Sequence, residues 1–198
     1  MRVLVACEYS GVVRDAFLRR GHYAVSCDLL PCDSLNSGDH YQGDVRNVLE
    51  NDWDLMIAHP PCTYLTNSGV SWLYRKPDRW AQLDEGAAFF KMLLDAPIPR
   101  KCIENPIMHK HAVERIGCRQ TQVIQPWMFG HMEQKGTGLW LHNLPLLVPT
   151  NNVREQMMAL PKNQRQRLHY LPPSADRWKL RSTTYFGIGE AMAIQWNF

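Results

Sequence analysis

Short apolar runs rich in β-branched residues alternate along the first half of the chain with longer amphipathic stretches. The apolar runs, at 3–6, 24–28, 55–58 and 102–104, are predicted strands, and the amphipathic stretches, at 12–20 and 80–94, are predicted helices. This alternation is typical of a mostly parallel sheet covered by helices on both faces. We therefore expect an α/β fold of the Rossmann-like type.

The second half of the chain is less regular. Residues 121–147 are predicted to form strands and turns, and a connection rich in Pro, Gln and Arg follows at 150–181. Gly187 and Gly189 then predict a tight turn that feeds a closely packed helix within 183–196. Because 198 residues bury one sizeable core more readily than two, we expect a single domain over 1–198, with 144–181 as a variable basic connection inside it.

Composition excludes several other classes of protein. The hydrophobic fraction of 45% is ordinary for a globular chain, and the sequence contains no repeat and no apolar run long enough to span a membrane. The first residues read as a strand rather than a secretory leader, so we expect a soluble, cytoplasmic protein. Its six cysteines include no CxxC pair, which predicts reduced thiols, no disulfide framework and no bound metal.

Positive charge is concentrated in one region. The net charge of +3 is too small to indicate nucleic-acid binding by itself. Between residues 154 and 181, however, seven Lys and Arg residues stand against two acidic residues. Such a local excess suits contact with phosphates, and a solvated basic surface is the equally weighted alternative.

The stretch VACEYSGVVRDAFLRRGHYAVSCD, residues 5–28, combines a strand, a glycine-bearing turn, a helix and a second strand that ends in an acid. This order is typical of nucleotide-type cofactor sites. With Gly11 alone in the turn, the stretch lacks GxGxxG, which favours a cofactor without a pyrophosphate. Asp28 then suits the ribose hydroxyls, and Asp44 an adenine amino group. A turn or cap role is the alternative for each carboxylate on its own.

Cys62 is the candidate nucleophile. Pro60 and Pro61 restrict the backbone before it, at the end of the predicted strand 55–58, and so fix the direction of the thiol. Carbon 5 of cytosine becomes reactive after a nucleophile has added at carbon 6, and a thiolate suits this addition and the later elimination. Packing in the core is the simpler interpretation of four other cysteines, namely Cys7, Cys27, Cys102 and Cys118.

Glu104 is the candidate partner of Cys62. Addition at carbon 6 places charge on ring nitrogen N3, which requires an acid or a hydrogen-bond donor at the Watson–Crick edge. Glu104 ends the predicted strand 102–104, so we expect it to face the same crevice. A protonated Glu104 would donate to N3, and this role requires a raised carboxyl pKa. Capping of the following helix is the alternative.

In this order, the segments ACEYSG, SCD, GDV, HPPC and IENP resemble the motifs of the cytosine-5 DNA methyltransferase family, in the small form that phages and prophages encode. The segment TYFGIGEAMAIQW, residues 184–196, is similar to the family's final helix, which packs beside the first loop. The resemblance implies a Rossmann-like methyltransferase fold, S-adenosylmethionine as cofactor, cytosine-containing DNA as substrate, and DNA modification in the cytoplasm of a bacterial host. It implies methyl transfer to C5 through a covalent adduct of Cys62 at C6.

The resemblance also implies a set of contact residues. Those for the cofactor are Cys7, Glu8, Tyr9, Ser10, Gly11, Asp28, Leu29, Asp44, Val45, Pro60, Gly187 and Glu190. Those for the substrate are Pro61 and Asn105, together with Lys135, Arg165 and Arg167 as substitutes for the family's Gln-x-Arg-x-Arg motif, which is not evident after residue 121.

Two features bear on the choice of substrate. The family places a large target-recognition region before its final helix, whereas this chain has residues 144–181 there, so autonomous recognition of a long sequence is not expected. The loop at 63–80 contains Trp72, Tyr74 and Trp80. Its aromatic side chains either close over the substrate or pack on the domain.

Three functions therefore stay open at this point. The first is methyl transfer to cytosine in DNA, with short-sequence specificity or with specificity supplied by a protein partner. The second keeps the chemistry but acts on a free cytidine nucleotide or RNA, or uses a modified sulfonium donor. The third is a non-catalytic partner subunit that binds DNA or the cofactor, against which the presence of both Cys62 and Glu104 argues.

Overall fold

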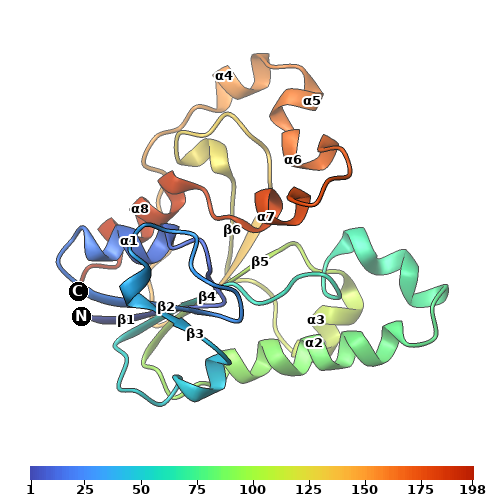
Figure 1. Ribbon diagram of the computed structural model, residues 1–198. Helices are drawn as coiled ribbons and strands as arrows, with labels where there is room; N and C mark the ends of the chain where they lie inside the picture. The colour runs from blue at the N-terminus through green and yellow to red at the C-terminus, as the bar shows by residue number, and fades with distance from the viewer.

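The computed structural model describes residues 1–198, apart from the side chain of Ser37, and in this described part the strands form one seven-stranded sheet of order β3-β2-β1-β4-β5-β7-β6 (Figure 1). Strands β1 to β5 pair in parallel through this order, and β7 runs antiparallel to both β5 and β6. The strands are β1 (Arg2–Ala6), β2 (Tyr23–Asp28), β3 (His40–Gln42), β4 (Leu55–Ala58), β5 (Arg100–Pro106), β6 (Gln122–Ile124) and β7 (Thr137–His142). The predicted mostly parallel α/β fold is confirmed.

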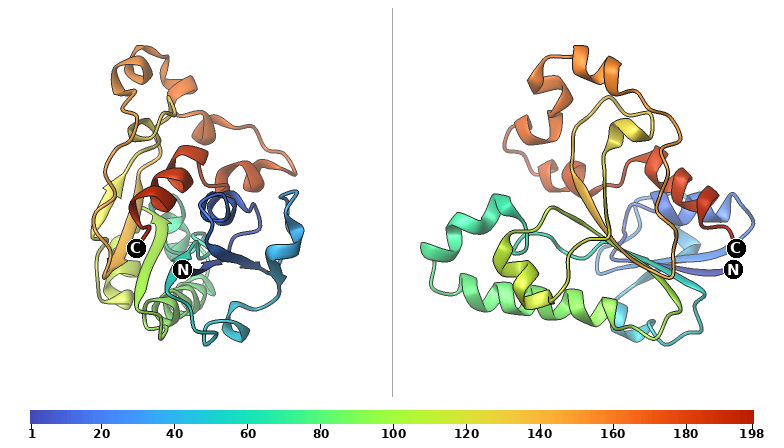
Figure 2. Two further views of the ribbon diagram at one scale, coloured as in Figure 1. Left: turned by 90° about the vertical axis from the view of Figure 1, so that its left-hand side faces the viewer. Right: turned by 180° about the vertical axis from the view of Figure 1, so that it is seen from behind.

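Helices cover both faces of the sheet. Helices α1 (Val12–Leu18) and α8 (Phe186–Gln195) lie side by side on one face, and α2 (Arg79–Leu94) and α3 (Lys110–Ile116) lie on the other (Figures 1 and 2). Successive side chains of a strand point to opposite faces. In β1, accordingly, Val3 and Val5 pack in the core beneath α1 and α8, whereas Leu4 and Ala6 pack in the core beneath α2 and α3.

The close approach of the last helix to its surroundings explains its small residues. A Cβ atom on Gly187 would lie 2.1 Å from the carbonyl oxygen of Phe129, and one on Gly189 would lie 3.4 Å from that of Val12, at the start of α1. Trp196, which follows α8, is fully buried. The prediction of a closely packed helix within 183–196 is confirmed.

The connection at 150–181 contains more regular structure than the sequence indicated. It forms α4 (Arg154–Ala159), α5 (Lys162–Arg165), α6 (Arg167–Tyr170) and α7 (Arg177–Ser182). The first three form a projection beyond the sheet, and α7 returns toward the loop after β1 (Figures 1 and 2). Met157 and Leu168 are buried in this projection, so tertiary contacts support helices too short to be stable alone.

Four short 3₁₀ helices complete the described elements: η1 (Ser37–Asp39), η2 (Val45–Asn47), η3 (Asn67–Tyr74) and η4 (Pro126–Met128). Of these, η2 begins at the valine of GDV and η3 follows HPPC, so both help to shape the sheet edge where the site was expected. None of the helices in the described part of the chain is both long and apolar enough to cross a bilayer.

Candidate active site

A cleft of about 870 Å³ opens at the carboxyl ends of β1, β2 and β4. Its walls come from the loops after these strands, from η3, from the residues before β7 and from α7. The predicted residues that line it are Cys7, Glu8, Tyr9, Ser10, Asp28, Pro61, Cys62 and Lys135. Residues far apart in sequence thus meet at one edge of the sheet, as the strand-end argument predicts.

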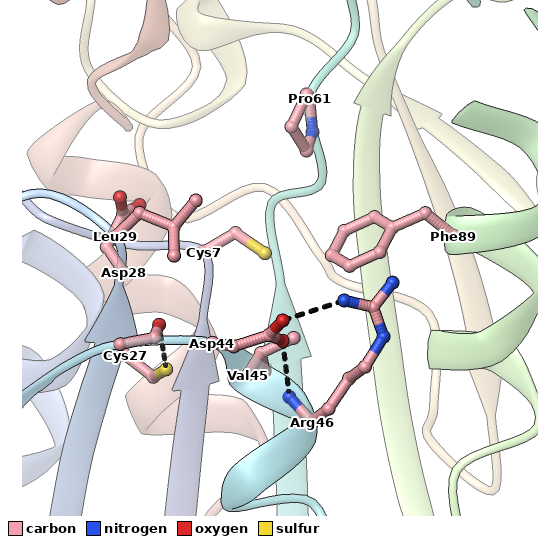
Figure 3. A pocket seen from close by; sticks show the side chains of 10 residues that line it. Cys7, Cys27, Asp28, Leu29, Asp44, Val45, Arg46, Pro61 and Phe89 are labelled. Atoms are coloured by element: carbon pink, nitrogen blue, oxygen red, sulfur yellow. Dashed lines mark hydrogen bonds and ion pairs between the residues drawn. The ribbon is translucent and has the colours of Figure 1, made fainter. Parts of the chain in front are cut away.

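A smaller pocket of about 150 Å³ adjoins the cleft, because Cys7, Asp28 and Pro61 line both cavities (Figure 3). Leu29 lies on one side of this pocket and the ring of Phe89, from α2, on the other (Figure 3). Its other lining residues are Cys27, Gly43, Asp44, Val45 and Arg46. The pocket therefore combines two apolar walls with two carboxylates.

The carboxylate of Asp44 is oriented by its neighbour Arg46. Oδ1 accepts a hydrogen bond from the Arg46 backbone N–H at 2.9 Å, and Oδ2 accepts one from the guanidinium at 2.7 Å. The backbone hydrogen bond is the main reason why the pKa of Asp44 lies below its ordinary value. Asp44 is therefore an ionised acceptor near neutral pH. At the end of β2, Oδ1 of Asp28 accepts from the backbone N–H of Leu30 at 2.9 Å.

The loop after β1 is held by a buried carboxylate. Oε1 of Glu8 accepts from the backbone N–H of Val13 at 2.7 Å, and Oε2 accepts from that of Arg14 at 3.2 Å. Gly11 begins α1 with a positive φ of 72°, a conformation that favours glycine. Glu8 thus orients the start of α1, and its side chain is 3% exposed. Its role in a cofactor site is to shape the loop.

The loop after β4 presents Cys62 to the cleft. Nδ2 of Asn105, from β5, donates to the carbonyl oxygen of Pro60 at 2.9 Å, so the end of one strand fixes the turn that follows its neighbour. Burial raises the pKa of the Cys62 thiol, the charge of Glu104 raises it further, and Lys135 opposes both. At neutral pH the resting side chain is therefore a thiol.

Glu104 contacts His59, which lines the cleft beside Cys62. Nδ1 of His59 lies 3.1 Å from Oε2 of Glu104. Burial alone would raise the pKa of Glu104, but the hydrogen bond and the charge of His59 hold it below its ordinary value. His59, to which the sequence analysis gave no role, thus lowers the pKa of Glu104 in the free protein, and the raised pKa required with a base bound stays a prediction.

The linings of both cavities, as the structure describes them, lack the predicted catalytic residue Glu104 and seven predicted contact residues, namely Gly11, Pro60, Asn105, Arg165, Arg167, Gly187 and Glu190. Arg165 donates to backbone carbonyl oxygens of Met158 and Leu160, and Arg167 pairs with Glu133. In α8, the backbone N–H of Gly187 donates to His131, and Glu190 pairs with Arg19 and Arg20. Arg165, Arg167, Gly187 and Glu190, for which the resemblance implied ligand contacts, thus bond to other residues of the protein in this structure.

The cleft also includes aromatic and basic side chains that are not among the predicted contact residues. Trp72 from η3 and Trp178 from α7 line it, and they are 44% and 53% exposed. Arg79, Arg177 and Arg181 line it as well. Tyr74 and Trp80 pack against His111, as one of the two predicted roles of the loop at 63–80 requires, and closure over a substrate stays a prediction for Trp72.

Comparisons with known proteins support the fold. No protein-family model and no curated protein matches the sequence. Among solved structures, a protein described as a prophage-encoded DNA modification methyltransferase of E. coli gives a TM-score of 0.47 at 13% identity, over 82% of this chain and 56% of that chain. The Entamoeba histolytica methyltransferase EhMeth gives 0.50 at 13% identity, over 77% and 57%. This chain thus spans little more than half the length of either structure, and at such identity the likeness to EhMeth shows a shared fold.

Proposed function

We propose that the protein transfers a methyl group from S-adenosylmethionine to C5 of cytosine in DNA through a covalent bond between Cys62 and C6. One observation carries this proposal: Cys62, the His59–Glu104 pair and a pocket containing Asp28 and Asp44 meet at one edge of the sheet. A thiol beside a carboxylate suits addition to the ring, and the adjoining pocket suits an adenosine.

The small pocket fits the adenosine part of the cofactor. Leu29 and Phe89 offer apolar surface to a flat base, and the ionised Asp44 accepts hydrogen bonds from an exocyclic amino group. Asp28, which lines both cavities, suits the ribose hydroxyls between them. When bound there, the sulfonium supplies an electrophilic methyl group.

Cys62 adds to carbon 6 in this proposal. The thiol must first lose its proton, and the positive charge of Lys135 favours the thiolate while burial opposes it. Water takes the thiol proton, and electrons that leave the C5–C6 double bond on addition accumulate at N3, which Glu104 stabilises by hydrogen bonding. After methyl transfer, water also takes the proton at C5, the electrons of that C–H bond restore the C5–C6 double bond, and the Cys62–C6 bond breaks to release the thiolate.

The walls of the cleft favour a polynucleotide over a free nucleotide. Exposed Trp72 and Trp178 offer stacking surfaces, and Arg79, Arg177 and Arg181 offer positive charge for phosphates. A base in a duplex must leave the helical stack before it can reach Cys62. A cleft that holds one base and contacts the neighbouring phosphates suits this geometry.

The test is transfer of tritium from labelled S-adenosylmethionine to duplex DNA, single-stranded DNA, RNA or dCMP, followed by mass analysis of the nucleosides. We expect label in DNA as 5-methylcytosine, and none with Cys62→Ala because the nucleophile is lost. Cys118→Ala is the matched control, since this cysteine is exposed and outside the cleft lining. Label in RNA or dCMP would change the substrate class. Cofactor binding without transfer to any of the four would contradict the enzyme proposal.

A further inference from the structure

His59 is buried and pairs with one carboxylate. Its Nδ1 contacts Glu104, in β5, and Glu8, which follows β1, has a smaller influence on the pKa of His59, while burial raises the pKa of Glu8 itself. The side chain is 10% exposed and borders the cleft. Its Nε2 is buried and has no hydrogen-bond partner among the described residues. One ring nitrogen is therefore used to contact Glu104, and the other is unused in the free protein.

The charged groups around His59 favour its protonated form. Glu104 and Glu8 face it from two strand ends, Lys135 opposes them from the segment before β7, and Cys62 is a thiol on its own loop. Burial alone would lower the pKa of His59, but Glu104 and then Glu8 raise it above its ordinary value of 6.5. The opposite pKa shifts of the two groups mean that a proton shared by the pair favours His59 over Glu104 in the free protein.

The proposed stabilisation of N3 requires a protonated Glu104, whereas the pair with His59 favours the ionised form. An ionised Glu104 can accept a hydrogen bond from the exocyclic amine of cytosine, but it cannot donate one to N3. A carboxyl with a lowered pKa would be protonated in a small fraction of molecules at neutral pH. His59 is a candidate source of this proton, because its Nδ1 lies 3.1 Å from Oε2 of Glu104.

We infer that His59 is a positioning residue that orients Glu104 through Nδ1 and stores the proton that Glu104 presents to N3 of the base. The inference rests on the proposed function. It assigns a specific task to the histidine of HPPC and explains why a buried imidazole stands next to the carboxylate.

The proton moves in two steps. When the base enters and displaces water, the ion pair of protonated His59 and ionised Glu104 becomes less stable than its neutral form. The Nδ1–H bond of His59 therefore breaks, an O–H bond forms on Glu104, and both side chains become neutral. When the thiolate adds to C6, the O–H proton passes to N3 and Glu104 becomes a carboxylate again. Elimination of the thiolate reverses the transfer, and the proton returns through Glu104 to His59.

The kinetic test uses His59→Asn, whose amide N–H can still donate to Glu104 but cannot titrate. For the unmodified protein, kcat/KM should fall as pH rises through the raised pKa of His59. In His59→Asn this fall should move to lower pH, because Glu104 must then take its proton from solvent, and kcat at pH 8 should drop by about 100-fold with little change in KM. His111→Asn is the matched control, since it removes a histidine–carboxylate pair, with Glu114, outside the cleft lining.

A second measurement does not depend on activity. An NMR titration of the histidine ring resonances should place the His59 pKa above 6.5 in the unmodified protein and lower in Glu104→Gln, which removes the negative charge. This titration still tests the interaction between His59 and Glu104 if the His59→Asn variant does not fold.

The outcomes separate this inference from the proposed function. Active protein with the same pH profile in His59→Asn, or a His59 pKa at or below its ordinary value, would overturn the inference and leave the function standing. Unmodified protein that transfers no methyl group to any cytosine substrate, even though the titration shows the pair, would refute the function, and the inference with it.

Discussion

At Asp44, backbone geometry determines the chemistry of a single side chain. The residue precedes η2, and the first backbone N–H groups of a helical turn lack partners within the helix. The N–H of Arg46 meets one carboxylate oxygen and keeps the group ionised. A short sequence signal, GDV, thus produces an oriented acceptor in an apolar pocket.

Asp44→Asn should weaken S-adenosylmethionine binding by about 10- to 100-fold, because an amide N–H would replace an acceptor opposite the adenine amino group. Isothermal titration calorimetry measures this change directly. Asp52→Asn is the matched control, since Asp52 is exposed and outside both cavity linings. An unchanged affinity in Asp44→Asn would exclude the proposed adenine contact.

At the scale of elements, the packing of α8 depends on glycine. Gly187 lies against the carbonyl oxygen of Phe129. A side chain at position 187 would clash with this oxygen, which cannot move easily because it belongs to the backbone. The same turn brings α8 onto α1, which begins at the loop that Glu8 organises. The C-terminal helix therefore supports the proposed cofactor site without lining either cavity.

Gly187→Ala should destabilise the protein by about 1–3 kcal/mol through overpacking, which corresponds to a Tm roughly 2–10 °C lower for a chain of this size. Thermal unfolding followed by circular dichroism provides the measurement. Gly38→Ala is the control, because a Cβ there meets nothing within 4 Å. Equal melting temperatures for the two variants would argue against the close packing of α8.

Elements with strong periodic patterns could be predicted from the sequence, and those created by tertiary contacts could not. Strands β1, β2 and β4 are mostly apolar runs, β5 has an apolar centre at Cys102 and Ile103, and α2 is a long amphipathic stretch, so each has a local signal. Helices α4 to α7 are four to six residues long, in a segment rich in Pro and Gln, and buried side chains such as Met157 and Leu168 stabilise them from outside. Stabilisation of this kind depends on contacts with distant residues, so no local sequence pattern indicates it.

The same distinction applies to the site. Cys62 and Asp28 follow strands and could be placed from the sequence at the sheet edge. Phe89 reaches the small pocket from the middle of α2, where an apolar residue is also what the core requires. The effect of His59 on Glu104 depends on the pairing of β4 with β5, which brings residues 45 positions apart into contact.

At the scale of the whole molecule, Tyr9 connects two distant parts of the chain. It lies in the loop after β1, its hydroxyl donates to the carbonyl oxygen of Lys179 in α7 at 3.1 Å, and its ring packs against Trp178. Lys179 also pairs with Asp33 at 2.8 Å. The helix that carries Arg177 and Arg181 to the cleft is thereby attached to the proposed cofactor loop.

Tyr9→Phe should loosen this attachment while keeping the ring contact. We expect faster amide hydrogen exchange across residues 177–182 and a KM for DNA that is raised about threefold to tenfold, as one hydrogen bond of roughly 1 kcal/mol would give. The value of kcat should change little, because Tyr9 does not contact the base in the proposal. Tyr170→Phe serves as the control on an exposed tyrosine. Unchanged exchange in α7 would show that the hydroxyl does not hold it.

The contact between α1 and α8 also has a consequence for how the protein is made. The two helices cover the same face of the sheet, yet more than 160 residues separate them in sequence. During synthesis, α1 is available early to cover part of that face, but the apolar side chains of β1, β4 and β5 beneath α8 stay exposed until residues 186–196 have left the ribosome. A chain without α8 would therefore expose this apolar surface to water and leave the loop after β1 without the support of α8.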